Sequence, residues 1–293
     1  MEKFIQYLRQ TFAEVKSKLP NDKQSKVSTL REKALNLIIS EGLPNSKDEL
    51  WRHFPIEKQI SSSYDIQLDA DPYQPVEQYF KCNVSDINTD MFTMLNGWYV
   101  HKNAPLTIFP NGVIVGSIMA AVEQYPELVL SHLTKFYSDK ADKFVRLNEL
   151  LFNDGFFVYV PDEVSVEKPM QFVSIVNSPQ KLMINNHNLV ILGRNASLSL
   201  VQCDDSLQQD QSFTNNVSEM ILEEGSHLHF YKMENKDAQT MELNHVFVHQ
   251  KGHSTFFSNA ITFNAGILRN MIHVDCMVCI WLTKNNLLIT RCM

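Results

Sequence analysis

The stretch of sequence that decides the fold runs from Leu147 to Met170 and reads LNELLFNDGFFVYVPDEVSVEKPM. Apolar residues on one helical face lead into this stretch: they occur at the i, i+3 and i+7 positions Phe144, Leu147 and Leu151. After the turn signal Asn153-Asp154-Gly155, the run Phe156–Val160 is apolar on both faces, which is typical of a buried strand. The junction therefore predicts that a helical region ends here and a β region begins.

The first forty residues read as two helices. The first has one amphipathic face that ends at Pro20, and the second runs from about Ser25 to Ser40, where Gly42 supplies the stop. Such an apolar stripe is more often a packing surface than a functional one. The face of the first helix consists of Phe4, Leu8, Phe12, Val15 and Leu19.

The pattern is mixed between the second helix and the junction. Five prolines between Leu50 and Gly112 disfavour long regular elements, and Tyr64 to Leu68 alternates like a short strand. Helical spacing returns from Gly116, with helices expected at about residues 118–122, 128–136 and 141–151. We therefore assign residues 1–150 to a mainly helical region that contains a proline-punctuated stretch.

Beyond the junction, short apolar runs follow one another at intervals of roughly ten residues. Turn residues separate them, among them Asn185-Asn186 and Gly193-Arg194-Asn195. This pattern is typical of an all-β sandwich, barrel or solenoid. Tight hairpin turns favour glycine, and the chain has only nine glycines, so a coil of parallel strands is favoured over a series of hairpins. The expected strands are Phe172–Val176, Leu189–Leu192, Leu198–Val201, Val217–Leu222, Leu228–Tyr231, Val246–Val248, Phe256–Phe263 and Ile272–Val274.

Composition and charge exclude several classes of protein. The chain has 293 residues, 44% of them hydrophobic, which is enough for a sizeable core. A formal net charge of −7 without a basic block argues against a nucleic-acid or anionic-membrane surface. Charged residues interrupt every apolar run in Met1 to Pro20, so we expect no signal peptide, no membrane span and a cytoplasmic protein. Five scattered cysteines are too few for a disulfide framework.

The histidines are the first candidates for a metal site. His227 and His229 alternate on one expected strand and so share a face, and His245, His249 and His253 lie nearby in the sequence. Acidic residues are not interleaved with them in a ligand pattern. We therefore expect these histidines to be exposed or packed, and we assign no metal ligand.

The cysteines give a weaker signal. Cys276-x-x-Cys279 resembles half of a zinc knuckle or a redox pair, but no second pair of this spacing occurs and no βαβ pattern surrounds it. Cys203 follows an apolar strand, and we expect it to be a small buried apolar residue. Neither position is assigned to a site.

Two groups of acidic residues are the candidates for catalysis. Carbohydrate-cleaving solenoids use carboxylates in a groove, and such a group could come from Glu219, Glu223 and Glu224 or from Asp204 and Asp205. We expect these acids to lie solvated at turns. The sequence also has no glycine-rich phosphate loop, GxSxG elbow or HExxH motif. It therefore defines no catalytic, cofactor-binding or metal residue, and we expect that the protein is not an enzyme.

The residues at the junction resemble the SufB/SufD family of iron–sulfur cluster assembly proteins. The matching features are Leu147-Asn148, NDGFFVYVP at Asn153–Pro161 and the VxxEKP-like end at Val164–Pro169. Each motif is short, and their order and spacing together carry the resemblance. Further matches are Leu43-Pro44, Glu49-Leu50-Trp51-Arg52, Leu189–Arg194, Asn216–Glu219 and Asn264–Arg269.

The helical N-terminal part with its E-x-W-R signature favours the SufD branch. The resemblance implies an N-terminal helical region, a right-handed parallel β-helix and a C-terminal helical region. It also implies an accessory scaffold subunit that works beside SufB and the SufC ATPase in cluster assembly and iron supply. The complex would handle the iron–sulfur cluster, and this chain alone would bind no cofactor.

The resemblance stops after Asp275, and the tail CMVCIWLTKNNLLITRCM (276–293) fits no strand pattern. The tail can be back-translated and read from the third base of the Cys276 codon. It then permits Y-G-L-Y-[LM]-A, followed by Gln and then Asp or Asn, which resembles the family's next segment, G-L-Y-L followed by Q-x-x-D. We hypothesise that residues 276–293 are out of frame after a small deletion. The β-helix of residues 151–275 would then be incomplete at its C-terminal end.

This hypothesis has consequences for partners and for solubility. In the family, later β-helix strands pair with the partner subunit and C-terminal helices dock the ATPase, so both the SufB-like and the SufC-like interface would be compromised. No family site residue is carried onto this chain, and an unpaired solenoid edge predicts poor solubility. Two alternatives stay open: a β-solenoid enzyme that acts on polysaccharide, and a general β-helix interaction module without an iron–sulfur link.

Overall fold

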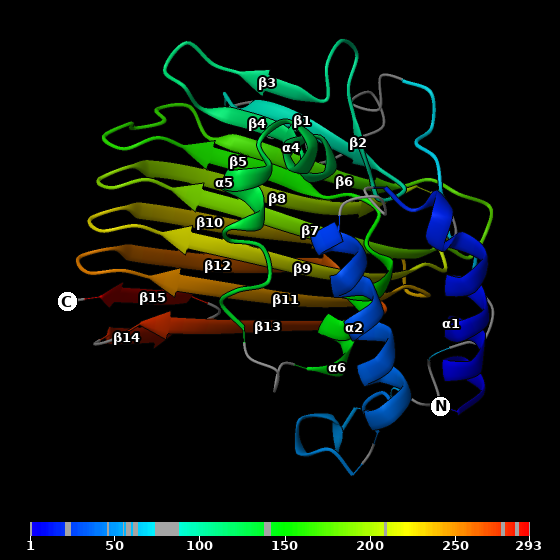
Figure 1. The fold of residues 1–293 in the computed structure, drawn as a ribbon. Helices are drawn as coiled ribbons and strands as arrows, with labels where there is room; N and C mark the ends of the chain where they lie inside the picture. The colour runs from blue at the N-terminus through cyan, green and yellow to red at the C-terminus, as the bar shows by residue number, and fades with distance from the viewer. Residues whose placement is uncertain are drawn as a thin grey trace.

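The computed structural model places a group of N-terminal helices beside a coil of β-strands (Figure 1). It describes residues 2–20, 25–45, 47–54, 56, 60, 64–73, 88–137, 142–207, 210–276, 279–284 and 287–292. Among these residues, no helix is both long and apolar enough to cross a membrane.

The helices form where the sequence has amphipathic faces. Phe4 and Leu8 on α1 are buried in one apolar cluster with Ile38 of α2 and Phe144 of α6. Gly42 ends α2 with a φ of 73°, and its N–H donates to the carbonyl of Ile38. These features confirm the first two helices expected from the sequence. The helix bounds are α1 Glu2–Val15, η1 Lys16–Lys18, α2 Ser25–Glu41, η2 Glu49–Trp51, α4 Ile118–Gln124, α5 Pro126–Leu130 and α6 Lys143–Leu151.

Successive strands from β5 to β13 alternate between two sheets as the chain coils. The first sheet has the order β14-β15-β12-β10-β8-β6-β1-β2, and the second has the order β13-β11-β9-β7-β5-β4-β3. Neighbouring strands from β5 to β13 pair in parallel, so the chain is a mixed α and β protein with a parallel β-solenoid of about 4 turns. The bounds are β1 Asp90–Leu95, β2 Trp98–Val100, β3 Leu106–Ile108, β4 Ile114–Ser117, β5 Phe156–Val160, β6 Met170–Val176, β7 Met183–Leu192, β8 Ser197–Ser206, β9 Phe213–Leu222, β10 His227–Asn235, β11 Met241–Gln250, β12 Thr255–Asn264 and β13 Ile267–Cys276.

An apolar core fills the space between the two sheets. It takes alternate residues from one end of each solenoid strand, because side chains alternate between the two faces of a strand. Phe156 of the second sheet stacks on Phe172 of the first, with ring centroids 4.2 Å apart. Both rings are almost fully buried, and burial of a side chain of this size contributes about 1.5–3 kcal/mol.

The helices cover the outer face of the second sheet. Helix α6 contacts β7 and β9, and α4 contacts β5 and β7. Figure 1 shows α4, α5 and α6 over these strands and α1 and α2 beside them. The junction identified in the sequence is thus the place where α6 leads into β5, the first of the strands that alternate between the sheets.

All eight strands expected beyond β5 are confirmed, and each is longer than its apolar run. Many residues of the extensions are polar. Asn185-Asn186, which the sequence indicates as a turn, lies inside β7 and is buried, so that prediction is wrong. The reason is that the interior supplies partners: the amide of Asn186 donates to the carbonyls of Gly97 at 2.7 Å and Asp154 at 3.2 Å.

Two further predictions are wrong. The stretch from Tyr64 to Leu68 is not a strand in the structure, where only an isolated bridge joins Asp65 to Leu182. The helix expected over residues 128–136 ends at Leu130. Thr134 there has a φ of 61°, and its backbone N–H donates to a carboxylate on β9 instead of a helical carbonyl.

The parallel order of strands ends at β13. Strands β14 (Cys279–Lys284) and β15 (Leu287–Cys292) then form an antiparallel hairpin, although the sequence of the tail fits no strand pattern cleanly. Strand β15 pairs antiparallel with residues 255–259 of β12. The remaining half of β12 exposes two large apolar side chains, Ile261 at 49% and Phe263 at 59%.

Candidate functional site

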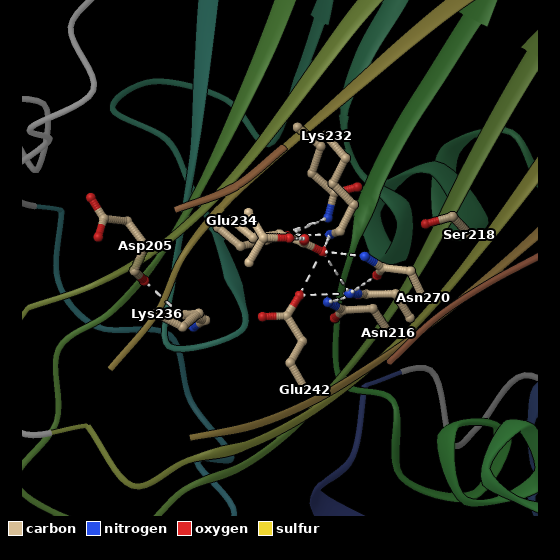
Figure 2. A network of polar contacts seen from close by, with 12 residues as sticks. Asp205, Asn216, Ser218, Lys232, Glu234, Lys236, Glu242 and Asn270 are labelled. Atoms are coloured by element: carbon tan, nitrogen blue, oxygen red, sulfur yellow. Dashed lines mark hydrogen bonds and ion pairs between the residues drawn. The ribbon is translucent and has the colours of Figure 1, made fainter. Parts of the chain in front are cut away.

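The inward-facing positions of the solenoid are apolar at one end of the strands and polar at the other. On β10, the buried residues Leu228 and Phe230 are followed at the same alternating spacing by Lys232 and Glu234. The polar end forms a buried network between the two sheets, which we call the interior network (Figure 2). Its charged and amide members are the buried Asp204, Asp205, Asp210, Asn216, Lys232, Glu234, Lys236, Glu242 and Asn244, together with Asn270, which is exposed on β13.

Lys232 is the centre of the interior network. Asp204 and Glu234 are register partners on β8 and β10, so two carboxylates lie side by side in the interior. The ammonium of Lys232 contacts Asp204 directly and lies 3.8 Å from Glu234 and 3.5 Å from Glu242 on the opposite sheet. Its side chain is 5% exposed, so these contacts replace water almost completely.

The pKa values in this group follow from burial and charge. Burial works against the charged form of Lys232, but the carboxylates, Asp204 first, outweigh it and raise the lysine pKa above its ordinary value. Burial also opposes ionisation of Asp204, yet the Lys232 ammonium holds its pKa below the ordinary value. For Glu242, burial and then the charge of Asp204 raise the pKa to about 7. Glu242 is therefore the member that takes up or releases a proton near neutral pH.

A row of asparagines joins the interior network across three coils. Asn216, Asn244 and Asn270 are register partners on β9, β11 and β13. The amide of Asn216 donates to Asn244 at 2.9 Å, and that of Asn244 donates to Asn270 at 2.8 Å. The Asn270 amide donates to Glu234 at 2.9 Å, which brings the row back to the charged group. These stacked amides satisfy polar groups that would otherwise be costly to bury.

A second lysine completes the interior network near the ends of the strands. Lys236 lies 3.8 Å from Asp210 and 3.5 Å from the backbone carbonyl of Asp205. Four buried carboxylates, those of Asp204, Asp210, Glu234 and Glu242, thus lie within 4 Å of two buried ammonium groups, a balance that fits the raised pKa of Glu242. Among the residues that the structure describes, no group of three or more His, Cys, Asp or Glu is arranged to hold a metal ion.

The acids singled out in the sequence are not where we expected them. Asp204 and Asp205 are buried on β8, and Glu219 is buried on β9, so the expectation of solvated turn residues is wrong for these three. It is confirmed for Glu224, which is exposed in the turn after β9, whereas Glu223 is half-buried and pairs with Lys251. Because the buried carboxylates are enclosed between or beneath packed elements, they offer no open groove for a polymeric substrate.

Glu219 belongs to a separate buried cluster under α6. Its Oε1 lies 2.8 Å from Nε2 of His187, whose Nδ1 lies 2.9 Å from Oδ1 of Asn148. The Asn148 amide nitrogen donates to the carbonyls of Asn186 and Asn215, so its oxygen must accept the imidazole proton. This cluster fixes α6 to β7 and β9. The signal in the sequence was the Leu147-Asn148 pair, but nothing indicated its partner histidine.

The five histidines considered as metal ligands lie in different places. His227 and His229 are exposed on the same face of β10, which confirms that they share a face. His245 is buried on β11, in the other sheet, where burial lowers its pKa to about 3. His249 stacks on Phe136 at 4.2 Å. His253 is exposed at the turn before β12, so the five do not form one cluster.

The cysteines lie in two different settings: Cys203 is a free thiol, whereas Cys276 is disulfide-bonded. Cys203 is 2% exposed and packs among apolar residues on β8, which confirms it as a small buried residue. Cys276 ends β13 and Cys279 begins β14, and the side chain of Cys279 lies outside the described residues.

The E-x-W-R stretch connects the helical region to the solenoid. Trp51 is 1% exposed, and its indole N–H donates to Asp142 at the N-terminus of α6. The guanidinium of Arg269 on β13 lies 4.3 Å from the Trp51 ring centroid. Trp51 thus joins the N-terminal region, α6 and the last parallel strand.

The class of this protein is defined by a helical region that leads into a parallel β-solenoid whose interior is apolar at one end of the strands and polar at the other. Comparison with known families gives two parts in the same chain order, with the boundary at residues 172–174. A model of the SufBD protein N-terminal region matches residues 1–172, and a model of the SUF system FeS cluster assembly, SufBD core domain, matches residues 174–277. The chain belongs to the SufBD family of SUF iron–sulfur cluster assembly proteins, which confirms the resemblance found in the sequence.

Curated relatives agree with this assignment. The chain is 22% identical over 182 residues to iron–sulfur cluster assembly SufBD family proteins of Staphylococcus epidermidis and Staphylococcus haemolyticus, with 61% of this chain and 38% of each relative covered. It is 25% identical over 137 residues to the iron–sulfur cluster assembly protein SufB of Bacillus subtilis, with 46% of this chain and 29% of that protein covered. The matched part is thus less than half of each relative's length.

Proposed function

We propose that the chain is an accessory scaffold subunit of the SUF system, on the SufD branch, and that it works in the cytoplasm beside a SufB-like subunit and a SufC-like ATPase. The observation that carries this proposal is the match of both the helical region and the solenoid core to SufBD models in chain order. The E-x-W-R stretch, anchored through Trp51, supports the SufD branch. In this role the chain performs no catalytic step, and the assembled complex handles the cluster.

A co-purification experiment tests this role. The chain carries an affinity tag and is co-expressed with the SufB-like and SufC-like proteins of the same organism. We expect both partners to be retained, more weakly than by a chain whose C-terminal frame has been restored. If neither form retains either partner, the SufD assignment is wrong and a general interaction module becomes the better description.

We further propose that the sequence from about Cys276 is read out of frame. Two observations support this proposal: the core-domain match ends at residue 277, and the parallel order of the solenoid ends with β13 at Cys276. The antiparallel hairpin that follows breaks the pattern of the preceding coils. Reading the coding DNA in the shifted frame tests this. We expect Y-G-L-Y-[LM]-A followed by further family-like sequence, whereas a shifted frame without such sequence would refute the proposal.

A further inference from the structure

We propose that His227 and His229 form a two-imidazole chelate for a divalent transition-metal ion such as Zn²⁺, Ni²⁺ or Cu²⁺ on the outer face of β10. Both side chains are exposed, and they occupy alternate positions of one strand, with buried Leu228 between them. Among the described residues, no hydrogen bond or ion pair engages either imidazole. The inference is independent of the proposed role in cluster assembly.

Other histidines of the β-solenoid lack this combination. His187 is buried and contacts Glu219 at 2.8 Å, and His249 contacts Asp275 at 3.0 Å. His245 is 1% exposed and cannot meet a hydrated ion without local unfolding. His273 is exposed on β13 but has no histidine two residues away, so among the described residues of the solenoid the pair on β10 is where two exposed imidazoles share one strand.

The strand geometry brings the two rings within reach of one ion. Residues two apart on a strand are separated by about 6.6 Å, and their side chains leave the sheet in the same direction. Nitrogen ligands lie about 2.0–2.1 Å from a zinc ion, so two of them in a tetrahedral arrangement are about 3.3 Å apart. Each exposed ring has to lean toward the other by less than about 2 Å, which ordinary rotamer changes allow.

The neighbours on the sheet leave room for this movement. The register partners of His227 are Ser197 and Thr255, and those of His229 are Ser199 and Phe257. Three of these four are small hydroxyl residues. The Phe257 ring lies 5.3 Å from the ring of His229 and restricts it on one side. The strand itself is held on both edges by parallel neighbours, so the chelating pair is fixed to a rigid scaffold.

Imidazole is a borderline ligand that suits zinc, nickel and copper, whereas magnesium and calcium prefer oxygen. Because no third His, Cys, Asp or Glu among the described residues completes a metal group, water fills the remaining positions of the ion. Such a site binds weakly and exchanges its ion readily. Acidification releases the ion because protons compete for the imidazole nitrogens.

Equilibrium dialysis of the purified chain against Zn²⁺ at pH 7.5 tests the proposal. We expect His227→Gln and His229→Gln each to weaken binding about tenfold or more, because each change removes the chelate effect. His253→Gln is the matched control, since His253 is also exposed but lies on a turn of the next coil. Unchanged thermal melting of all three variants shows that the fold is intact.

Two results would overturn the proposal. One is an unchanged Zn²⁺ affinity in the His227→Gln and His229→Gln double variant, which would place any bound ion elsewhere. The other is an equal loss in His253→Gln, which would show that the β10 pair is not the site. Loss of co-purification with SUF partners would affect neither result, so the two proposals can fail separately.

Discussion

Replacement of Lys232 by methionine tests whether the interior network holds the solenoid together. Methionine keeps the length and apolar body of the lysine but removes the ammonium that three carboxylates share. The side chains of Lys232 and Glu234 are 5% and 0% exposed, so solvent cannot take over the role of the cation. Removal of one partner from a buried ion pair costs about 3–5 kcal/mol, a large fraction of the 5–15 kcal/mol that stabilises a typical domain.

Urea unfolding followed by circular dichroism at pH 7.5 measures this loss. The matched control is Lys251→Met, because Lys251 also pairs with a carboxylate, Glu223, at 2.7 Å. Its side chain is 49% exposed, so we expect a loss of at most about 1 kcal/mol. Equal losses in the two variants would refute the view that burial makes the Lys232 contacts strong.

The pH dependence of Lys232→Met gives an independent check. Without the ammonium, the pKa values of Asp204 and Glu242 rise in the folded state. A carboxyl group with a raised folded pKa stabilises the fold when protonated and loses that contribution as pH rises. The deficit of the variant should therefore shrink as pH falls from 7.5 to 5. A deficit that stays constant over this range would show that the lost ammonium does not act through these carboxylates.

Three further predictions concern single residues. Glu242→Gln should stabilise the protein above pH 7 by at most about 3 kcal/mol, because the pKa of Glu242 is about 7 in the folded protein and 4.5 ordinarily. The gain in stability should vanish below pH 4.5, and unfolding curves measured across this pH range check it. Arg269→Met should cost about 1–2 kcal/mol in urea unfolding, since it removes the cation beside Trp51, and an unchanged midpoint would refute the contact. Phe263→Lys should reduce light scattering of the concentrated protein without lowering its melting temperature, because it places a charge on the exposed half of β12; undiminished scattering would show that association occurs elsewhere.

Much of the solenoid could be predicted because its strands carry apolar runs at a constant spacing. Alternation around Leu228 and Phe230 placed β10 correctly, but the predicted strand stopped at Tyr231 because charged residues follow. In the structure the same alternation continues inward through Lys232 and Glu234. A charged residue on a strand is usually exposed, and only the partners on β8 and β11, distant in sequence, show that this one is not.

The buried clusters escaped prediction for the same physical reason. Glu219 was found as a candidate acid, yet its contact with His187 depends on the register of β7 and β9, which a single strand does not reveal. Asn185-Asn186 has the composition of a turn, and it enters a strand only because the interior there is polar. The local helix pattern also predicted too long a helix at α5. The backbone N–H of Thr134 donates to Glu219 instead of a helical carbonyl, and the helix ends early.

The role in cluster assembly is tested most directly by the specific activity of an iron–sulfur enzyme in cells. A strain without this gene is compared with strains that carry the present allele or an allele with its C-terminal frame restored. If the chain is a SUF subunit, the restored allele raises the activity per amount of enzyme protein above that of the deletion strain, while an enzyme without a cluster is unchanged. Equal activity in the deletion strain and in both complemented strains would contradict a role in iron–sulfur cluster assembly.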